Sequence, residues 1–227
     1  MPNVVDIFIQ PDKALAELRE RPTALVPITL VCLLATVSTA VYFLKVDPAW
    51  FIEHTLAASG RELSSAQLEE ARKAMPGTGV IGYISTAFAV FASAGFPILF
   101  AIYLHMASRL AGRSTSFMQS LGLAAWASMP QALGSLSSLI AILAMEPQTA
   151  LESVAVTNVD PLLVSLADED RWSTLARSFS LLNLWGIALV AMGWRALGRA
   201  GWSQALLVAA MPALLVYGAM AGYALTK

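Results

Sequence analysis

Arg109-Leu-Ala-Gly-Arg113 and Arg195-Ala-Leu-Gly-Arg199 are the two stretches that decide the fold of this chain. An aromatic residue, a Gln and a Leu at alternate positions follow each of them, in Phe117-Met-Gln119-Ser-Leu121 and Trp202-Ser-Gln204-Ala-Leu206. Each stretch lies between two long apolar runs. A pattern that recurs in this setting predicts a duplicated membrane hairpin.

The composition is too apolar for a soluble globular domain. Hydrophobic residues make up 57% of the 227 and charged residues only 13%, whereas soluble domains average about half and about a quarter. A membrane-spanning helix needs about 20 apolar residues. Runs of that length predict five spans, over residues 24–44, 80–106, 117–145, 174–195 and 203–225. All five are expected to be helices, because an open sheet leaves backbone groups unsatisfied in lipid.

The charges of the loops predict the orientation of the chain. The two repeat loops carry Arg109, Arg113, Arg195 and Arg199 without an acidic residue, so the positive-inside rule places both in the cytoplasm. With five spans the N-terminus is cytoplasmic as well. The inner side then holds seven basic and four acidic residues, and the outer side holds seven and eleven. Spans two and three and spans four and five would form a parallel hairpin repeat.

The membrane domain is predicted to cover residues 24–225, and besides the two repeat loops three further segments lie outside the predicted spans. Residues 1–23 have an amphipathic pattern, which favours a helix along the inner interface over a docking site for a cytosolic partner. Residues 45–79 are predicted to form an external loop with two helices, the first starting at Asp47-Pro48 and ending at Gly60, and the second ending near Ala74. The external loop 146–173 is acidic, but its acids are scattered, which favours solvated side chains over a metal site.

No motif in the sequence points to catalysis. The chain has no nucleophile elbow, no zinc-protease motif, no phosphate-binding loop and no pair of membrane aspartates. His54 and His105 fall on opposite sides of the predicted membrane, so they cannot share a metal. We therefore expect no enzyme activity, no metal and no cofactor. His105 is expected to be an interfacial residue rather than a proton relay.

Polar side chains inside the predicted spans are costly and are candidates for function. Gln131 lies next to Pro130 in the third span, and Asn183 lies half-way along the fourth. If they meet, they form an interhelical hydrogen bond; the alternative is that they line a polar path for a solute. Arg177 is expected to reach outward to Asp170 or another external acid.

Three loose motifs resemble the Yip family, which is named for its interaction with Ypt/Rab GTPases. They are Ile7-Phe8-x-x-Pro11, Ala124-Ala-Trp-Ala-x-Met-Pro130-x-x-Leu133, and Leu181-Leu-Asn-Leu-Trp185 followed by Gly193. The resemblance covers nearly the whole chain and implies five membrane helices with a cytoplasmic N-terminus. Eukaryotic members are linked to traffic in the endoplasmic reticulum and Golgi and have a long N-terminal region that the 23 residues before the first span do not match. A compact bacterial member in the inner membrane is therefore expected, without the GTPase-binding role.

Together these patterns favour a non-enzymatic membrane protein with a membrane-organising or adaptor role. The four loop arginines would bind anionic lipid head groups, or alternatively would only set the topology. The alternative function is a small-solute or ion transporter or channel, with a path near Gln131 and Asn183. The expected partners are membrane lipids and a cytosolic or membrane protein; nucleic acid is not expected. Gly218 and Gly222 could pack either within the bundle or against a second copy of the chain, so the oligomeric state is open from sequence.

Overall fold

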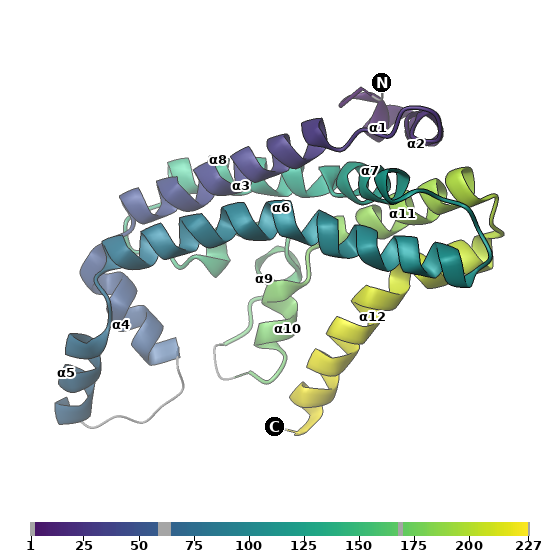
Figure 1. The fold of residues 1–227 in the computed structure, drawn as a ribbon. Helices are drawn as coiled ribbons and strands as arrows, with labels where there is room; N and C mark the ends of the chain where they lie inside the picture. Colours follow the sequence, from purple (N-terminus) through teal and green to yellow (C-terminus); the bar gives the residue numbers. More distant parts are fainter. Residues whose placement is uncertain (1–2, 59–64, 168–169, 227) are drawn as a thin grey trace.

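The computed structural model describes residues 3–58, 65–167 and 170–226, and within these ranges the chain is helical. The only extended pairing in the described residues is an isolated antiparallel bridge between Asn158 and Ser180. The prediction of an all-α protein is therefore confirmed. Figure 1 shows the long helices running side by side, with short helices at both ends and on one side.

Four of the helical stretches are long and apolar enough to cross a membrane. They are α3 (Leu25–Lys45), α6 (Thr78–Leu110), α7 (Phe117–Ala127) joined to α8 (Met129–Ala144), and α12 (Trp202–Thr226). At about 1.5 Å per residue, even α3 is about as long as the hydrocarbon core is thick. Four of the five expected spans are thus present as long apolar helices.

The predicted fourth span, 174–195, is wrong as a continuous helix. Instead, α10 (Ser173–Ser178) ends before α11 (Leu182–Gly198) begins. The backbone between them pairs with another segment, because the Val159 amide donates to Phe179 O at 2.9 Å and the Leu181 amide donates to Thr157 O at 3.0 Å. These bonds hold the chain extended where a helix would need the same groups. The 17 residues of α11 span about 25 Å.

The helices pack through close approaches of small side chains. The hydroxyl of Ser38 in α3 donates to Ser135 O in α8 at 2.9 Å, which joins two parallel helices. Gly82 of α6 lies so near Phe43 of α3 that an added Cβ would come within 2.9 Å of Phe43 Cβ. Because α6 runs back along α3, both repeat loops, 109–113 and 195–199, lie at the same end of the bundle (Figure 1). We call it the arginine end.

One long helix leaves the bundle. Near the arginine end α12 lies against α6, where Tyr103 Oη donates to Val208 O at 2.8 Å. Further along, α12 bends away and its C-terminal part stands apart from α6 (Figure 1). Pro212 lies inside α12 and Pro97 inside α6, and a proline removes one helical hydrogen bond and permits a bend. The two helices therefore diverge toward the end of the bundle opposite the arginine end (Figure 1).

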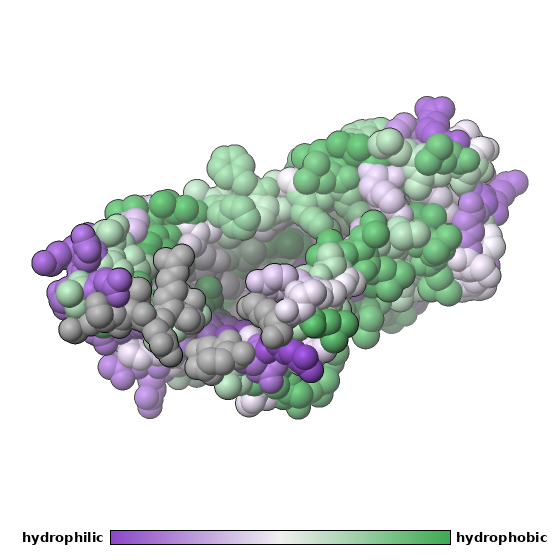
Figure 2. Space-filling model, turned by 90° about the horizontal axis from the view of Figure 1, so that it is seen from below, coloured by the Kyte–Doolittle hydropathy of each residue, from purple (hydrophilic) through white to green (hydrophobic). Residues whose placement is uncertain are grey.

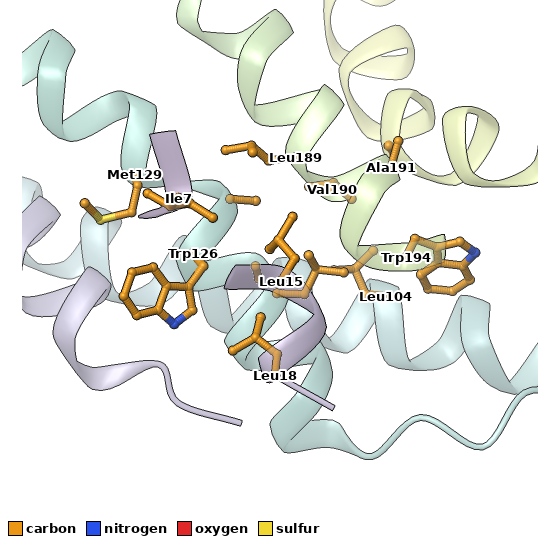
Figure 3. Close-up of a cluster of buried hydrophobic side chains, with 14 of the residues drawn as sticks. Ile7, Leu15, Leu18, Leu104, Trp126, Met129, Leu189, Val190, Ala191 and Trp194 are labelled. Carbon is orange, nitrogen blue, oxygen red and sulfur yellow. The ribbon is translucent and has the colours of Figure 1, made fainter. Parts of the chain in front are cut away.

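The N-terminal segment forms α1 (Asp6–Ile9) and α2 (Pro11–Glu17), which pack on the bundle near the arginine end. Ile7, Leu15 and Leu18 are completely buried there (Figure 3). Their partners are side chains of α7 and α11, including Trp126 and Val190. The segment is helical, and part of its apolar face is buried against protein. The placement along the inner lipid interface stays a prediction.

Two helices form the loop after α3, as predicted. The first, α4 (Pro48–Ala58), is capped by Asp47, whose carboxylate accepts from the Trp50 amide at 2.7 Å. The second is α5 (Ser65–Ala74). The expected end of the first helix at Gly60 lies outside the described residues. The other loop contains η1 (Glu152–Val154) and α9 (Val159–Leu162), and both contact α10 or α8.

Candidate functional site

The two arginine loops are joined to each other by Arg113. Its guanidinium donates to Gly198 O and, at 2.6 Å, to Gln204 Oε1. The first bond closes the end of α11, whose last carbonyls have no helical partner. Arg113 therefore holds the two hairpins together, and it is half-buried.

The remaining loop arginines divide into one packed and two exposed side chains. Arg195 lies over the ring of Trp202, with its guanidinium carbon 3.9 Å from the ring centre, in a cation–π contact. Arg109 and Arg199 are exposed, and their side chains make no hydrogen bond or ion pair with any described residue. The four predicted site residues thus fall into two groups, and only Arg109 and Arg199 are available to a ligand.

A glutamine of the repeat fastens the N-terminal segment to the bundle. Gln119 and Ser116 form a capping box at the start of α7, and the Gln119 amide also donates to Arg19 O at 2.8 Å. Nearby, the indole of Trp126 donates to Thr23 O at 2.9 Å. Neither role was predicted from the sequence. The capping box has a local signal in the Ser116-x-x-Gln119 spacing, but the contact with Arg19 has none.

His105 lies in the part of α6 near the arginine end. It is half-buried, and its ring meets the edge of Phe117 with centroids 6.2 Å apart. No described group accepts from or donates to its buried Nδ1. His105 therefore forms no hydrogen bond with the loop arginines or with the polar side chains around Gln131.

Gln131 and Asn183 are brought together in the middle of the bundle. Gln131 Nε2 donates to Asn183 Oδ1 at 2.7 Å. Asn183 Nδ2 donates to Tyr217 Oη at 2.8 Å, and the tyrosine hydroxyl donates to Ser178 O at 3.2 Å. This chain of hydrogen bonds, which we call the polar chain, connects α8, α11, α12 and the end of α10. Tyr217 was not predicted, because nothing local distinguishes it from an interfacial tyrosine.

An apolar cavity of about 470 Å³ lies beside the polar chain. It is walled by α3, α6, α7, α8, α11 and α12, and both Pro97 and Pro212 line it. Its polar lining is confined to a few side chains, which are Ser93, Ser128, Gln131, Ser135, Asn183 and Tyr217. Figure 2 looks onto the face from which α12 projects and shows a hollow with hydrophobic residues inside it and along its upper edge.

A second cavity of about 280 Å³ adjoins the first on the side away from the arginine end. Its lining is more polar than that of the first, although apolar side chains such as Ile142, Leu151 and Val154 still contribute most of the surface. We call it the polar cavity for its polar residues, which are Ser38, Thr39, Gln131, Ser135, Ser138, Thr157 and Asn158. Ala155, Thr157 and Asn158 line it with non-helical backbone. Thr157 lies beside Gly134, where an added Cβ would come within 3.4 Å of Thr157 Oγ1. Non-helical backbone at this depth is tolerated where it lines a polar cavity.

Arg177 anchors the segment that breaks the predicted fourth span. Its Nε donates to Asp160 Oδ2 at 3.4 Å, and its Nη1 lies 3.6 Å from Glu152 Oε1. These are acids of the predicted external loop, as expected, although neither is Asp170. Glu152 also meets His54 Nε2 at 3.2 Å, which ties this segment to α4. Among the described residues, no three His, Cys, Asp or Glu side chains group closely enough to hold a metal ion.

One comparison with known proteins identifies a family. Residues 5–223 match the sequence profile described as the Yip1 domain, which is nearly the whole chain. No curated protein sequence and no solved structure gives a significant match. The match covers the arginine end, the polar chain and both cavities.

Proposed function

Since this chain belongs to the Yip1 domain family, we propose that it is a non-enzymatic multi-pass membrane protein with a membrane-organising or adaptor role. It acts through the arginine end, which faces the cytoplasm and binds anionic lipid. The single observation that carries this proposal is the pair of exposed, unengaged guanidiniums on Arg109 and Arg199. We place the protein in a bacterial inner membrane.

The neighbours of these arginines support a position at the membrane surface. Leu110, next to Arg109, is 89% exposed, and Trp202, three residues after Arg199, is 50% exposed. Large apolar side chains beside cations are typical of the lipid interface, where the apolar side chain contacts the hydrocarbon and the cation contacts the head groups. Each exposed arginine would add about 1 kcal/mol of attraction to an anionic leaflet.

The connectivity supports five crossings, although one lacks a long helix. The chain leaves α8 at Ala144, at the end opposite the arginine end, and reaches Gly198 at the arginine end. It must therefore traverse the bundle between these residues. We propose that α11 makes the inner part of this crossing and that the segment with α9 and α10 makes the outer part.

An adaptor role would use the outer face of α2. Its buried face is occupied by the bundle, whereas Asp12 and Lys13 are exposed, as is Arg19 just beyond the helix. This mixed-charge face is where we place a cytosolic partner. The docked segment gives that partner a rigid surface, which lowers the ordering cost of binding.

Lipid selectivity tests the proposal. We expect the full chain, reconstituted in phosphatidylcholine vesicles, to prefer spin-labelled phosphatidylglycerol over spin-labelled phosphatidylcholine. In the double variant Arg109→Gln/Arg199→Gln, the ratio of phosphatidylglycerol to phosphatidylcholine binding should fall about fivefold for each arginine removed. High salt should weaken the preference of the parent chain, because exposed charges are screened.

The matched control removes two charges elsewhere. Arg72→Gln/Lys73→Gln changes α5, where Arg72 is already paired with Glu53 at 3.1 Å. We expect little change in selectivity from this variant. Equal losses in the two double variants, or no loss in either, would overturn the lipid-binding role of the arginine end.

The alternative, transport of a small solute or ion, has one observation in its favour. The polar cavity beside Gln131 could hold a hydrated solute. The larger cavity next to it is walled mostly by apolar side chains, which is unfavourable for an ion. Ion or solute flux into vesicles that depends on the chain and falls in Gln131→Leu would favour transport over the proposed role.

A further inference from the structure

The two cavities meet at the polar chain. They share Ala35, Gln131 and Ser135 in their walls, so α3 and α8 border both. The smaller cavity has the larger share of polar lining, and the change in polarity occurs at Gln131. A continuous site that is apolar on one side and polar on the other has the pattern of an amphiphile.

Several polar atoms at or near this junction have no hydrogen-bond partner among the described residues. Gln131 donates to Asn183, but its Oε1 accepts from no described residue. The hydroxyls of Ser135 and Ser138 likewise have no hydrogen-bond partner among the described residues. Unsatisfied polar groups inside a membrane are costly, so these atoms are suited to a ligand that carries hydroxyl groups.

The position of the apolar cavity identifies the other half of the occupant. It lies between α6 and α12, two of the helices long enough to cross the membrane, at the place where they diverge (Figure 1). The surrounding medium at that depth is lipid hydrocarbon, and an apolar cavity excludes water. The polar cavity has no charged residue in its lining, which disfavours recognition of a charged head group.

We propose that the two cavities together bind one uncharged membrane amphiphile of the glyceride type. Its hydroxylated head lies in the polar cavity, its acyl chain lies in the apolar cavity between α6 and α12, and Gln131 binds it at the junction. Each cavity is of ligand size or slightly below, against about 300–1,000 Å³ for typical ligand pockets. This site is separate from the arginine end and does not depend on its role.

Photolabelling tests where the acyl chain lies. The probe is a monoacylglycerol with a diazirine in its chain, added to the full-length protein in phosphatidylcholine vesicles. We expect labelled peptides to come from α6 and α12 around Phe96 and Ala213. Ala213→Phe fills the apolar cavity and should abolish this labelling, whereas the control Ala219→Phe, at an exposed position of the same helix, should preserve it.

A second probe tests the head group. A methyl ester with the same diazirine chain lacks the hydroxyls, and we expect it to label about fivefold less, the effect of one hydrogen bond. Gln131→Leu and Ser135→Ala should each move this ratio toward one. The methyl ester has no hydroxyl that Gln131 or Ser135 could bind, so its labelling should be the same in both variants as in the parent chain. A variant that keeps this labelling is therefore correctly folded.

Two results would overturn the proposal. Equal labelling by both probes in the parent chain would show that the polar cavity recognises no head group. Labelling that survives in Ala213→Phe would show that the chain binds elsewhere on the lipid-facing surface. Neither result would bear on the selectivity of the arginine end for anionic lipid, so the two proposals fail separately.

Discussion

Gly193 has the closest neighbour of all the described glycines. It lies in α11 against α7, and a Cβ at this position would overlap Leu123 Cδ1, a side chain that is itself buried. In the sequence, Gly193 belongs to the predicted fourth span, where small residues let helices approach one another. The structure shows which helix makes that approach.

Gly193→Ala should therefore destabilise the chain, although Gly→Ala inside a helix is otherwise stabilising by about 0.5–1 kcal/mol. Overpacking costs about 1–3 kcal/mol, so the net change should lower the melting temperature in detergent. Gly218→Ala in α12 is the matched control, since an added Cβ there meets nothing within 4 Å. An equal or higher melting temperature for Gly193→Ala than for the control would contradict the close contact of α11 with α7.

Predictability differs among the polar residues. Gln131 and Asn183 were recognisable because an amide inside an apolar run stands out, and their meeting was one of two outcomes open from sequence. Tyr217 and Ser178 complete the polar chain, whose hydrogen bonds join residues 34 to 52 positions apart in the sequence. Such contacts depend on the tertiary fold, which the hydropathy of single runs does not contain.

Among the elements, α1 and α2 bury part of their apolar face against α7 and α11. Their apolar side chains would suit a lipid surface as well as a protein groove, and the sequence alone could not separate the two. The groove exists because α7 and α11 lie side by side with small residues between them. Phe8 adds an edge-on contact with Trp185 of α11, with ring centroids 5.4 Å apart.

Leu15→Ala should release this segment from the bundle. Leu15 is completely buried, and truncating a buried leucine costs about 2–5 kcal/mol, which is enough to favour local opening of two short helices. We expect trypsin to cleave after Lys13 and Arg19 faster in the variant than in the parent chain. Ile9→Ala is the control, because Ile9 is 69% exposed, and equal cleavage of the two variants would show that the docking is not maintained by Leu15.

The elements with local signals were predicted well. Asp47-Pro48 predicted the start of α4, and the end of α5 at Ala74 was also predicted. The prediction of one helix over 174–195 was wrong. The run is as apolar as a membrane span, but its backbone at residues 179–181 forms hydrogen bonds with residues 157–159. An apolar run indicates that a segment lies in lipid or in a protein core. It does not indicate whether the backbone amides of that segment form their hydrogen bonds within one helix.

For the molecule as a whole, the family and the helical class could be predicted, but the cavities could not. The profile match over residues 5–223 bears out the resemblance, which rested on three loose motifs. Pro97, Pro212 and the bond between Asn183 and Tyr217 lie in three different helices, and no single stretch of sequence specifies how α12 diverges from α6. The site for an uncharged amphiphile therefore rests on geometry that composition and loop charge could not supply.

The arrangement of the whole chain predicts which loops share a side of the membrane. Arg113 bonds to Gly198, so Ser114 and Ser203, which are both exposed, must lie on one side, and the exposed Gln148 must lie on the other. In a Cys32→Ala background, we expect Gln148→Cys to react with an impermeant maleimide added to intact cells. Ser114→Cys and Ser203→Cys should react only after the membrane is opened. Reaction of these two on opposite sides would contradict the fold, whereas a reversal of all three would contradict only the orientation inferred from charge.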